Sequence, residues 1–530
     1  MRPLTLLALH ALVGLTPLCA DGPAPRPARA PEALRHAGVD LEAALRAGLR
    51  QVLDPEGFNA ATADAQLRLA YEQLFTLDAA RIDLARLDAR AAQVVQLTFE
   101  LQLAIDERMA EFDAAGRYPA KLANAKRRAL RGLRYLRERV LLRTARADPG
   151  RLYGDSTPRL AAWAPAFHWT VRASHAQLPP ERFPRTFVLL SEGGSPTSAA
   201  IARSADEDNM FSHLSVGYVS DQPYTVKGVD YPAGTPFTIE SFINSGVTVR
   251  LLEAHMSGKN NREVLFFLRD PAKQAALDQA AEAFFERVLL AQASGAPLGY
   301  DFSMGTAKIK GLVAELEGTP GNEGRVFDPA VVRMDGAHYR DVNDYFCSEV
   351  GEAVFATAGL QLFPHRSTVE AGAGTRRLFE SWGIDPSIPI SAPGDADVSP
   401  ALVRIAEGAK LGLLRANHQR HAALTSVFRW LDDGYTLRVP WYVKAFGKTA
   451  AGYARLPILP SFGLPKVSAD VMISTIALNK VASKLTARLA ADDEAFFAEH
   501  GRAMTPAETY AHLDRIRGEL KLARWLRPVE

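Results

Sequence analysis

The sequence contains two cysteines, and the surroundings of Cys347 suggest chemistry. Residues 344–350 (DYFCSEV) are typical of a helix start, and Asp344 is the expected N-cap. A cysteine in a first helical turn lies at the positive end of the helix dipole, which favours the thiolate. The backbone amides of Cys347 and Ser348 would also be available to an oxyanion. Cys347 is therefore a candidate nucleophile, and an inert core cysteine is the alternative interpretation.

The candidate base for this thiol is His213, which begins a segment with the period of a β-strand. Within residues 213–219 (HLSVGYV), His213, Ser215 and Gly217 share one face, so the imidazole has only small neighbours on its side. A helix or a substrate can therefore approach the ring closely. A structural histidine held by hydrogen bonds is the alternative interpretation.

Glu240 is the candidate third member, because it lies in the strand predicted to follow the histidine strand. Residues 237–243 (FTIESFI) alternate in the same way, and an antiparallel pairing can set Glu240 opposite His213 on one face. A carboxylate in that place would orient the ring and stabilise its protonated form. Glu253 is the rival for this position, in the chain that follows the next predicted strand at 247–251. A further apolar strand is predicted at 264–268.

These three residues together predict acyl transfer through a thioester. His213 would draw the proton from Cys347, and the thiolate would attack an amide or ester carbonyl. Amides at the helix start would hold the oxyanion, and His213 would then protonate the leaving group and activate water. The residues that we expect to line the oxyanion site and the cleft are Ser348, Tyr345 and Tyr218.

The same segments resemble the permuted papain-like amidases of the YaeF/YiiX type, which are circularly permuted relatives of the NlpC-type cell-wall peptidases. In the unpermuted peptidases the cysteine helix precedes the histidine strand, whereas here the histidine comes first. The resemblance covers roughly residues 185–365 and is carried by 211–217 (FSHLSVG), 238–241 (TIES), 264–269 (VLFFLR), 300–302 (YDF) and 345–350 (YFCSEV).

The resemblance implies an α+β fold, with a permuted papain-like (NlpC-type) domain that has a small antiparallel sheet and a Cys-bearing helix, flanked by N- and C-terminal helical regions. It implies Cys347 as nucleophile, His213 as base and Glu240 as the third polar member. Two features depart from the family pattern. The usual Gly-Asp before the first core strand is replaced by residues 186–191 (TFVLLS), and 27 positions separate His213 from Glu240.

The resemblance also implies a cysteine hydrolase, and we expect no cofactor or metal. For the exported protein that the N-terminus predicts, the accessible substrates would be a cell-envelope peptide or a lipid-linked substrate. A lipid-acting thioesterase or acyltransferase is the alternative within the enzymes. A catalytically inactive envelope binding or scaffold protein is the alternative from another class.

Composition excludes several other classes of protein. The 530 residues carry 62 Lys and Arg against 60 Asp and Glu, so a formal charge of +2 provides no basic field for a nucleic acid. A mean hydropathy of −0.08 argues against a polytopic membrane protein. Two cysteines exclude a disulfide framework and a Cys-rich zinc module.

The N-terminus predicts export. Residues 1–20 combine a short positive start, an apolar run and a small residue before Asp21, as in a secretory signal peptide cleaved after about Ala20. We expect a periplasmic location, and acylation of Cys19 as a lipid anchor or a buried N-terminal helix are the alternatives. Residues 21–32 are rich in Pro and Ala and are predicted to be a linker.

The remaining chain is predicted to form three regions. Residues 33–148 carry helical periodicity and predict a bundle, 160–365 form the catalytic domain, and 366–530 are mostly helical. The oligomeric state is left open.

Several other segments have a structural and a functional interpretation. The basic run 126–146 is expected to be the solvated face of a helix, with an anionic surface as the alternative partner. The apolar stretch 455–465, with Trp441, Tyr442 and Phe446 upstream, is expected to be core, with peripheral membrane contact as the alternative. His418 and His421 have a spacing that could hold a metal, but without a third ligand we expect a solvated helix face. The segments expected to be loops are 191–195 (SEGGS) and the acidic run 206–208.

Overall fold

The fold is described from a computed structural model. The described residues are 40–75, 82–147, 166–175, 183–194, 196–204, 209–258, 260–369, 372–439, 469–500, 502–520, 522 and 525–528. The expected signal peptide with Cys19, the linker, the acidic run 206–208 and the stretch 455–465 with Trp441, Tyr442 and Phe446 lie outside them.

The chain divides into two compact units. The first comprises residues up to Asp155 together with Asp492–Thr509, and the second comprises Ser156–Ala491 together with Tyr510–Glu530. The first unit contains the helices predicted between residues 33 and 148, and the second contains the segments that carry the candidate site.

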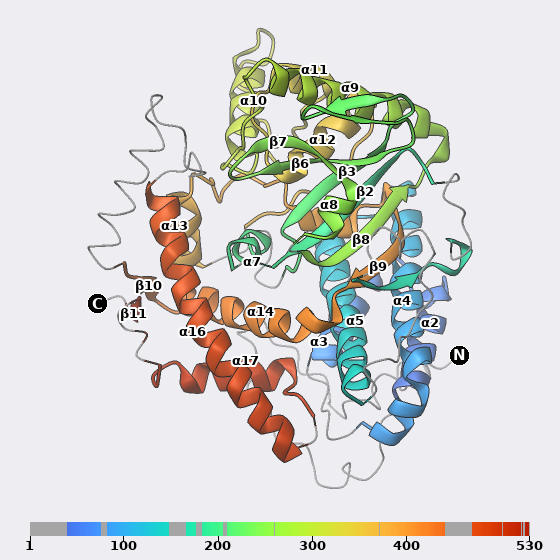
Figure 1. The fold of residues 1–530 in the computed structure, drawn as a ribbon, viewed down its shortest axis with the longest axis vertical. Coiled ribbons are helices and arrows are strands. Elements are labelled where there is room, and N and C mark those ends of the chain that lie inside the picture. The colour runs from blue at the N-terminus through green and yellow to red at the C-terminus, as the bar shows by residue number, and fades with distance from the viewer. Residues whose placement is uncertain are drawn as a thin grey trace. The chain divides into compact units, whose positions relative to one another are not determined.

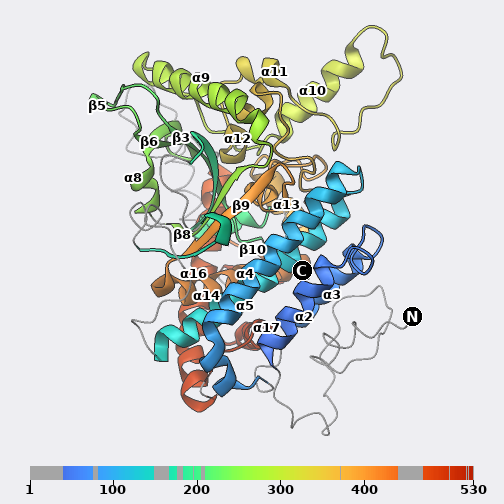
Figure 2. The ribbon, with the colours of Figure 1, turned by 90° about the vertical axis from the view of Figure 1, so that its right-hand side faces the viewer.

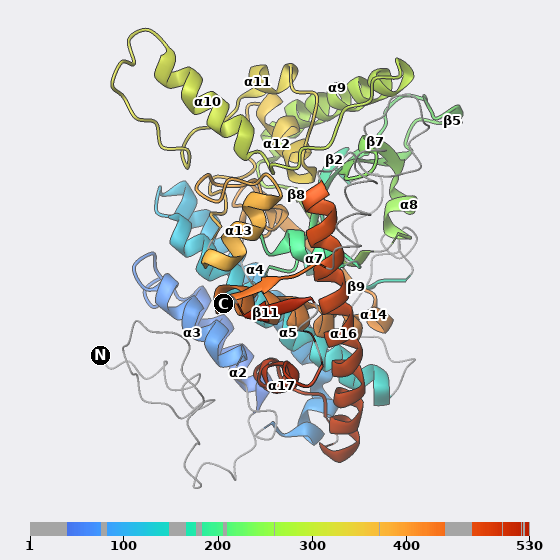
Figure 3. The same ribbon diagram turned by 90° about the vertical axis from the view of Figure 1, so that its left-hand side faces the viewer.

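Within the described part of residues 40–147, the first unit contains four helices that pack as neighbours (Figures 2 and 3). They are α2 (Leu41–Leu53), α3 (Ala63–Phe75), α4 (Leu84–Ala114) and α5 (Ala120–Ala147). Asp40 and Asp83 cap α2 and α4, because their carboxylates accept hydrogen bonds from Ala43 N at 3.1 Å and Arg86 N at 2.9 Å. Residues Asp492–Thr509 also belong to this unit. They comprise the end of α16 (Ala469–His500) and the start of α17 (Pro506–Ile516).

The basic run on α5 is buried, which contradicts the expectation of a solvated face. Lys126, Arg134 and Arg137 are 1%, 1% and 4% exposed. Lys126 Nζ lies 2.8 Å from Asp106 Oδ1, and Arg137 Nη1 donates to Gln102 Oε1 at 2.7 Å. Polar partners on α4 satisfy Lys126 and Arg137 inside the bundle, so the positive charges of this run do not indicate an exposed helix face.

A seven-stranded sheet organises the second unit, with the order β1-β9-β8-β2-β3-β6-β7 (Figure 1). Every neighbouring pair is antiparallel. The strands are β1 (His168–Val171), β2 (Thr186–Gly193), β3 (His213–Val219), β6 (Pro236–Phe242), β7 (Gly246–Leu251), β8 (Asn260–Leu268) and β9 (Leu402–Ala409). The α+β class with an antiparallel sheet is confirmed, as are the predicted strands of the histidine region. The two-stranded pairs are β4 (Tyr224–Val226) with β5 (Val229–Tyr231), and β10 (Tyr435–Leu437) with β11 (Leu526–Pro528).

Helices and 3-10 turns surround this sheet. The α-helices are α7 (Pro196–Ala202), α8 (Leu252–Met256), α9 (Gln274–Ala293), α10 (Thr306–Gly318), α11 (Gly336–Arg340), α12 (Cys347–Thr357), α13 (Ala373–Ser381) and α14 (Leu411–Asp432). The 3-10 turns are η3 (Ala173–His175), η5 (Pro271–Lys273) and η6 (Pro393–Val398). The helix start predicted at residues 344–350 corresponds to the beginning of α12.

The expected domain boundary at residue 365 is not a division of the structure. Strand β9 comes from the region predicted to be mostly helical, yet it pairs with β8 over Leu402–Ala409 and with β1 on its other side. The physical reason is that β8 is buried along nearly its whole length and without β9 would be an exposed edge strand.

Two helices cover opposite faces of the strands that carry His213. Helix α12 packs on β3 and β6, and a side chain added to its Gly351 would meet Leu214 at 2.7 Å. Leu252 and Met256 of α8 pack instead in a core cluster with Phe187, the cross-strand partner of Gly217. His213 and Gly217 share a face, so α8 lies on the histidine side and α12 on the leucine side (Figure 2).

Among the described residues, none of the helices combines the length and the apolar character that a membrane span requires.

Candidate active site

The first turn of α12 positions Cys347. Phe346 is the N-cap in an extended conformation, so Asp344 does not occupy the expected capping place. Glu349 instead accepts a hydrogen bond from Phe346 N at 2.7 Å. A carboxylate three residues after the cap satisfies one of the free amides of the helix start.

A partly buried lysine contacts that carboxylate. Lys308 Nζ on α10 lies 2.9 Å from Glu349 Oε2 and 2.5 Å from Asp301 Oδ2. Burial lowers the pKa of Lys308, but the charges of Glu349 and Asp301 raise it above its ordinary value. The three charged side chains connect α10 and the 300–302 segment to the start of α12. They therefore restrain the helix end that carries Cys347.

Cys347 itself is buried beside the start of the histidine strand. Its side chain is 2% exposed, and Sγ donates to the carbonyl oxygen of Ser212 at 3.7 Å. Ser212 immediately precedes His213, and its hydroxyl accepts from Gly193 N at 3.0 Å. The structure thus brings together the two residues that the sequence places 134 positions apart.

His213 and Glu240 form a hydrogen-bonded pair. His213 Nε2 lies 2.9 Å from Glu240 Oε2, and the Phe242 ring stacks on the imidazole at 5.0 Å. The β3–β6 register pairs Val216 with Ile239. Its continuation sets Glu240 against Ser215, so Glu240 reaches His213 diagonally from the same face rather than from directly opposite.

The charge environment favours the protonated imidazole. Burial lowers the pKa of His213, but hydrogen bonds and charges from Cys347 and Glu240 raise it to about 9. Since Glu240 uses Nε2, Nδ1 is the ring nitrogen left for the thiol. Burial raises the pKa of Glu240, whereas His255 and His213 together bring it well below its usual value. The arrangement is suited to an imidazolium that neutralises a thiolate.

His255 is a site residue that the sequence reasoning missed. Its Nδ1 lies 3.0 Å from Glu240 Oε2, and its Nε2 lies 3.3 Å from Glu263 Oε1. Glu263 also accepts from Ser191 Oγ at 2.6 Å. Burial lowers the pKa of His255, but Glu240 and Glu263 raise it to about 10. Imidazoles and carboxylates therefore alternate from His213 through Glu240 and His255 to Glu263.

One sequence signal could have found His255. Residues 252, 255 and 256 have the spacing of an inward helical face, and all three are buried. Glu253, the rival of Glu240, is exposed on the outer side of the same short helix.

Tyr218 and Tyr345 do not line an open cleft, which corrects the expectation for both. Each is 0% exposed, and each hydroxyl is bound to an arginine, Tyr218 to Arg185 Nη2 at 2.8 Å and Tyr345 to Arg287 Nη1 at 2.9 Å. Tyr218 points to the leucine side of β3, because strand side chains alternate. Tyr218 therefore links β3 to Arg185, and Tyr345 links the residues before α12 to Arg287 on α9.

Ser348 contributes differently from the expectation. It is fully buried, and its hydroxyl donates to the Ser391 carbonyl. Its side chain therefore anchors α12, and only its backbone amide at the helix start is of the type that binds an oxyanion.

Tyr300 is a tyrosine that interacts electrostatically with Cys347. Its ring packs on Phe346 with 5.7 Å between centroids. Burial and the negative charge of Cys347 raise the pKa of Tyr300 well above its usual value. A neutral phenol next to the nucleophile can donate a hydrogen bond.

His421 belongs to a buried polar network and not to a solvated helix face, so that expectation is wrong. His421 Nε2 lies 2.5 Å from Glu192 Oε1, and its Nδ1 lies 3.1 Å from Arg203 Nη2. Burial lowers the pKa of His421 to about 4. Glu192 is at the end of β2, in the segment 191–195 expected to be a loop. Within the described ranges, no group of three or more His, Cys, Asp and Glu residues is arranged to hold a metal ion.

Comparisons with protein-family models, with curated proteins and with solved structures found no match to this chain.

Proposed function

We propose that the protein is a cysteine hydrolase that cleaves an amide or ester bond through a thioester. The observation that carries this proposal is the Glu240 carboxylate, 2.9 Å from Nε2 of a His213 ring that also interacts with Cys347 at the start of α12. A nucleophile, a base and a residue that orients the base are the three parts that covalent acyl transfer needs.

In the proposed reaction, Cys347 Sγ attacks the carbonyl carbon, and the π electrons of that carbonyl move to its oxygen. The backbone amides at the first turn of α12 would hold this oxyanion. Collapse of the tetrahedral intermediate breaks the bond to the leaving group, which takes a proton from His213. Water, deprotonated by His213, then attacks the thioester and releases the acid and the thiolate.

The chain order supports a permuted papain-like arrangement as part of this proposal. The histidine strand β3 and the carboxylate strand β6 come before the cysteine helix α12, as in the family that the sequence resembles. A protein exported to the cell envelope would meet envelope peptides there, so we propose a peptide amide of the envelope as the substrate class.

A thiol-directed probe tests the chemistry. In the full chain carrying Cys19→Ser, Cys347 is the only thiol. Iodoacetamide should label Cys347 at pH 7, and we expect His213→Ala to slow labelling by about tenfold or more because the thiolate loses its counter-ion. His175→Ala is the matched control, since His175 lies on η3 and its hydrogen-bond partner is Ser174.

Turnover separates an enzyme from a binding protein. With an activated acyl ester as probe, His213→Ala should reduce turnover by about 10²–10⁴-fold, and Cys347→Ser should abolish the initial burst. Equal labelling of the native protein and His213→Ala, or no burst with the native protein, would instead favour the inactive binding or scaffold protein.

A further inference from the structure

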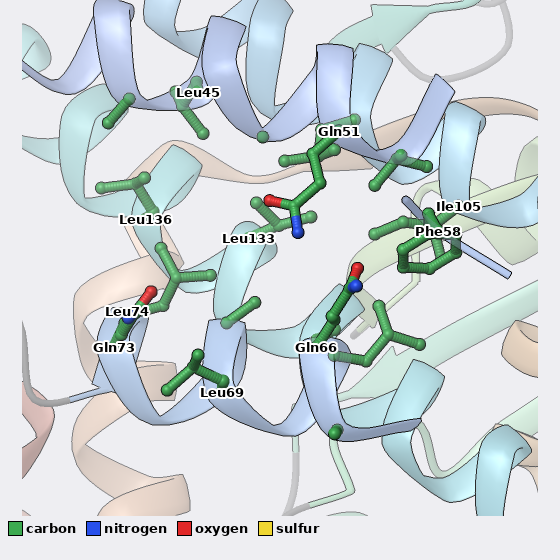
Figure 4. Close-up of a pocket in the computed structure, with 18 of the residues that line it drawn as sticks. Leu45, Gln51, Phe58, Gln66, Leu69, Gln73, Leu74, Ile105, Leu133 and Leu136 are labelled. Carbon is green, nitrogen blue, oxygen red and sulfur yellow. The ribbon is translucent and has the colours of Figure 1, made fainter. Parts of the chain in front are cut away.

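A cavity of about 220 Å³ lies inside the helical bundle of the first unit, among α2, α3, α4 and α5 (Figure 4). Leu45, Phe58, Ile105 and Leu133 are representative of its lining, which is aliphatic and aromatic except for three glutamines. Interiors of proteins are normally packed without voids of this size. An engineered apolar cavity of about 150 Å³ already binds benzene, so this one has room for a larger apolar molecule.

The glutamines are the feature that packing alone does not explain. Gln73 on α3 is 7% exposed, and its Oε1 has no hydrogen-bond partner among the described residues. Gln66, two turns earlier on the same helix, donates from Nε2 to the Gly57 carbonyl at 2.9 Å. That bond fixes the orientation of the amide, and Gln66 Oε1 is left buried without a partner.

Within the part of the chain that the structure describes, two buried amide oxygens at one apolar cavity have no donor, and a bound ligand would supply one. A buried acceptor without a partner is costly. A buried water typically makes about three hydrogen bonds, and a largely aliphatic wall offers few. An aliphatic molecule with a donor at one end would match the apolar wall and satisfy one of the two amides.

We propose that this cavity binds a medium-length aliphatic chain whose polar end, an amide N–H or a hydroxyl, donates a hydrogen bond to Gln66 or to Gln73, which lie two turns apart on α3. A volume of about 220 Å³ matches a small molecule rather than a helix or strand of another protein. Figure 4 shows Gln51 and Gln66 reaching into the cavity, with Gln73 at its edge beside Leu74. This site is independent of the proposed hydrolase chemistry.

Binding of two matched ligands to the full-length protein tests the proposal. Decanamide offers N–H donors, whereas methyl decanoate has a similar chain and only acceptors. Isothermal titration should give saturable binding of decanamide with an affinity about tenfold above that of the ester, as one or two hydrogen bonds require. Along a series of amides from six to ten carbons, affinity should rise about three- to fourfold per methylene until the cavity is full.

Variants assign the binding to the cavity. Ala70→Phe and Ala129→Phe fill it from different helices, and each should abolish binding while far-UV circular dichroism stays native. The double variant Gln66→Leu/Gln73→Leu should bind both ligands alike, which keeps the test valid even if the filled variants do not fold. Leu53→Ala, an exposed position on α2 outside the lining, and Cys347→Ser should bind as the native protein does.

The binding results either support or overturn the proposed ligand site. Loss of the preference for decanamide in the double glutamine variant supports the assigned contacts. Absence of saturable binding by the native protein, or unchanged binding in a folded Phe variant, overturns the proposal. Equal affinity of the native protein for both ligands overturns the role of the glutamines.

Discussion

A single carboxylate oxygen, Oε2 of Glu240, lies 2.9 Å from Nε2 of His213 although 27 positions separate the two residues. The same oxygen lies 3.0 Å from Nδ1 of His255. Glu240 therefore contacts two imidazoles. His213 lies on the side of Cys347, and His255 lies on the side of the buried Glu263. Its buried charge controls the protonation of both rings.

The first prediction concerns the pH dependence of turnover. The pKa of His213 is raised to about 9, and the protonated ring must give a proton to the leaving group. We expect kcat/KM to fall as the pH rises through about 9. In Glu240→Gln the neighbouring negative charge is lost, so the alkaline limb should move to lower pH. A pH–rate profile of both proteins measures this, and an unmoved limb would contradict the role of Glu240.

The second prediction concerns stability around His255. Its pKa is raised in the folded state to about 10, so protonation stabilises the fold fully below the unfolded value of about 6.5. This contribution is lost as the pH rises from about 6.5 through about 10. His255→Gln should cost about 3–5 kcal/mol near neutral pH, because two buried carboxylates lose their shared cation. Thermal melts at pH 6.5 and pH 10 should differ less for the variant than for the native protein.

Lys308 and Lys310 provide a matched pair for the third prediction. Lys308 is 14% exposed between two buried carboxylates, whereas Lys310 is 70% exposed and lies 3.2 Å from Asp385. Lys308→Met should cost about 3–5 kcal/mol of unfolding free energy and slow the labelling of Cys347. Lys310→Met should change the unfolding free energy by no more than about 0.5 kcal/mol. Denaturant titration of the two variants provides the comparison, and equal losses would argue against a positioning role for Lys308.

The fourth prediction uses two glycines with opposite expectations. A side chain at Gly217 would meet the Phe187 ring at 2.1 Å, whereas a side chain at Gly311 on α10 meets nothing within 4 Å. Gly217→Ala should therefore destabilise the protein by about 1–3 kcal/mol through overpacking. Gly311→Ala should stabilise it by about 0.5–1 kcal/mol, because alanine favours a helix interior. Melting temperatures that move in the same direction for both would refute this account of the histidine strand.

The sequence alone predicts the local elements that carry the candidate site. The alternation in 213–219 and 237–243 predicts two neighbouring strands, and 344–350 predicts the helix start at Cys347. An antiparallel pairing of these strands can set Glu240 on the face of His213, because the period of a strand is two residues, but the register that does so comes from the fold.

The tertiary structure decided what lies around those elements. His255 reaches Glu240 through packing of α8 on the histidine face, and residues 402–409 complete the sheet from far along the chain. Burial of the basic residues on α5 depends on partners from α4. Such contacts join residues that are distant in the chain, and a charged or polar side chain is tolerated inside only where its partner arrives. Local periodicity predicts on which face of a helix or strand a side chain lies. The residue that it contacts there is determined by the packing of the helices and strands.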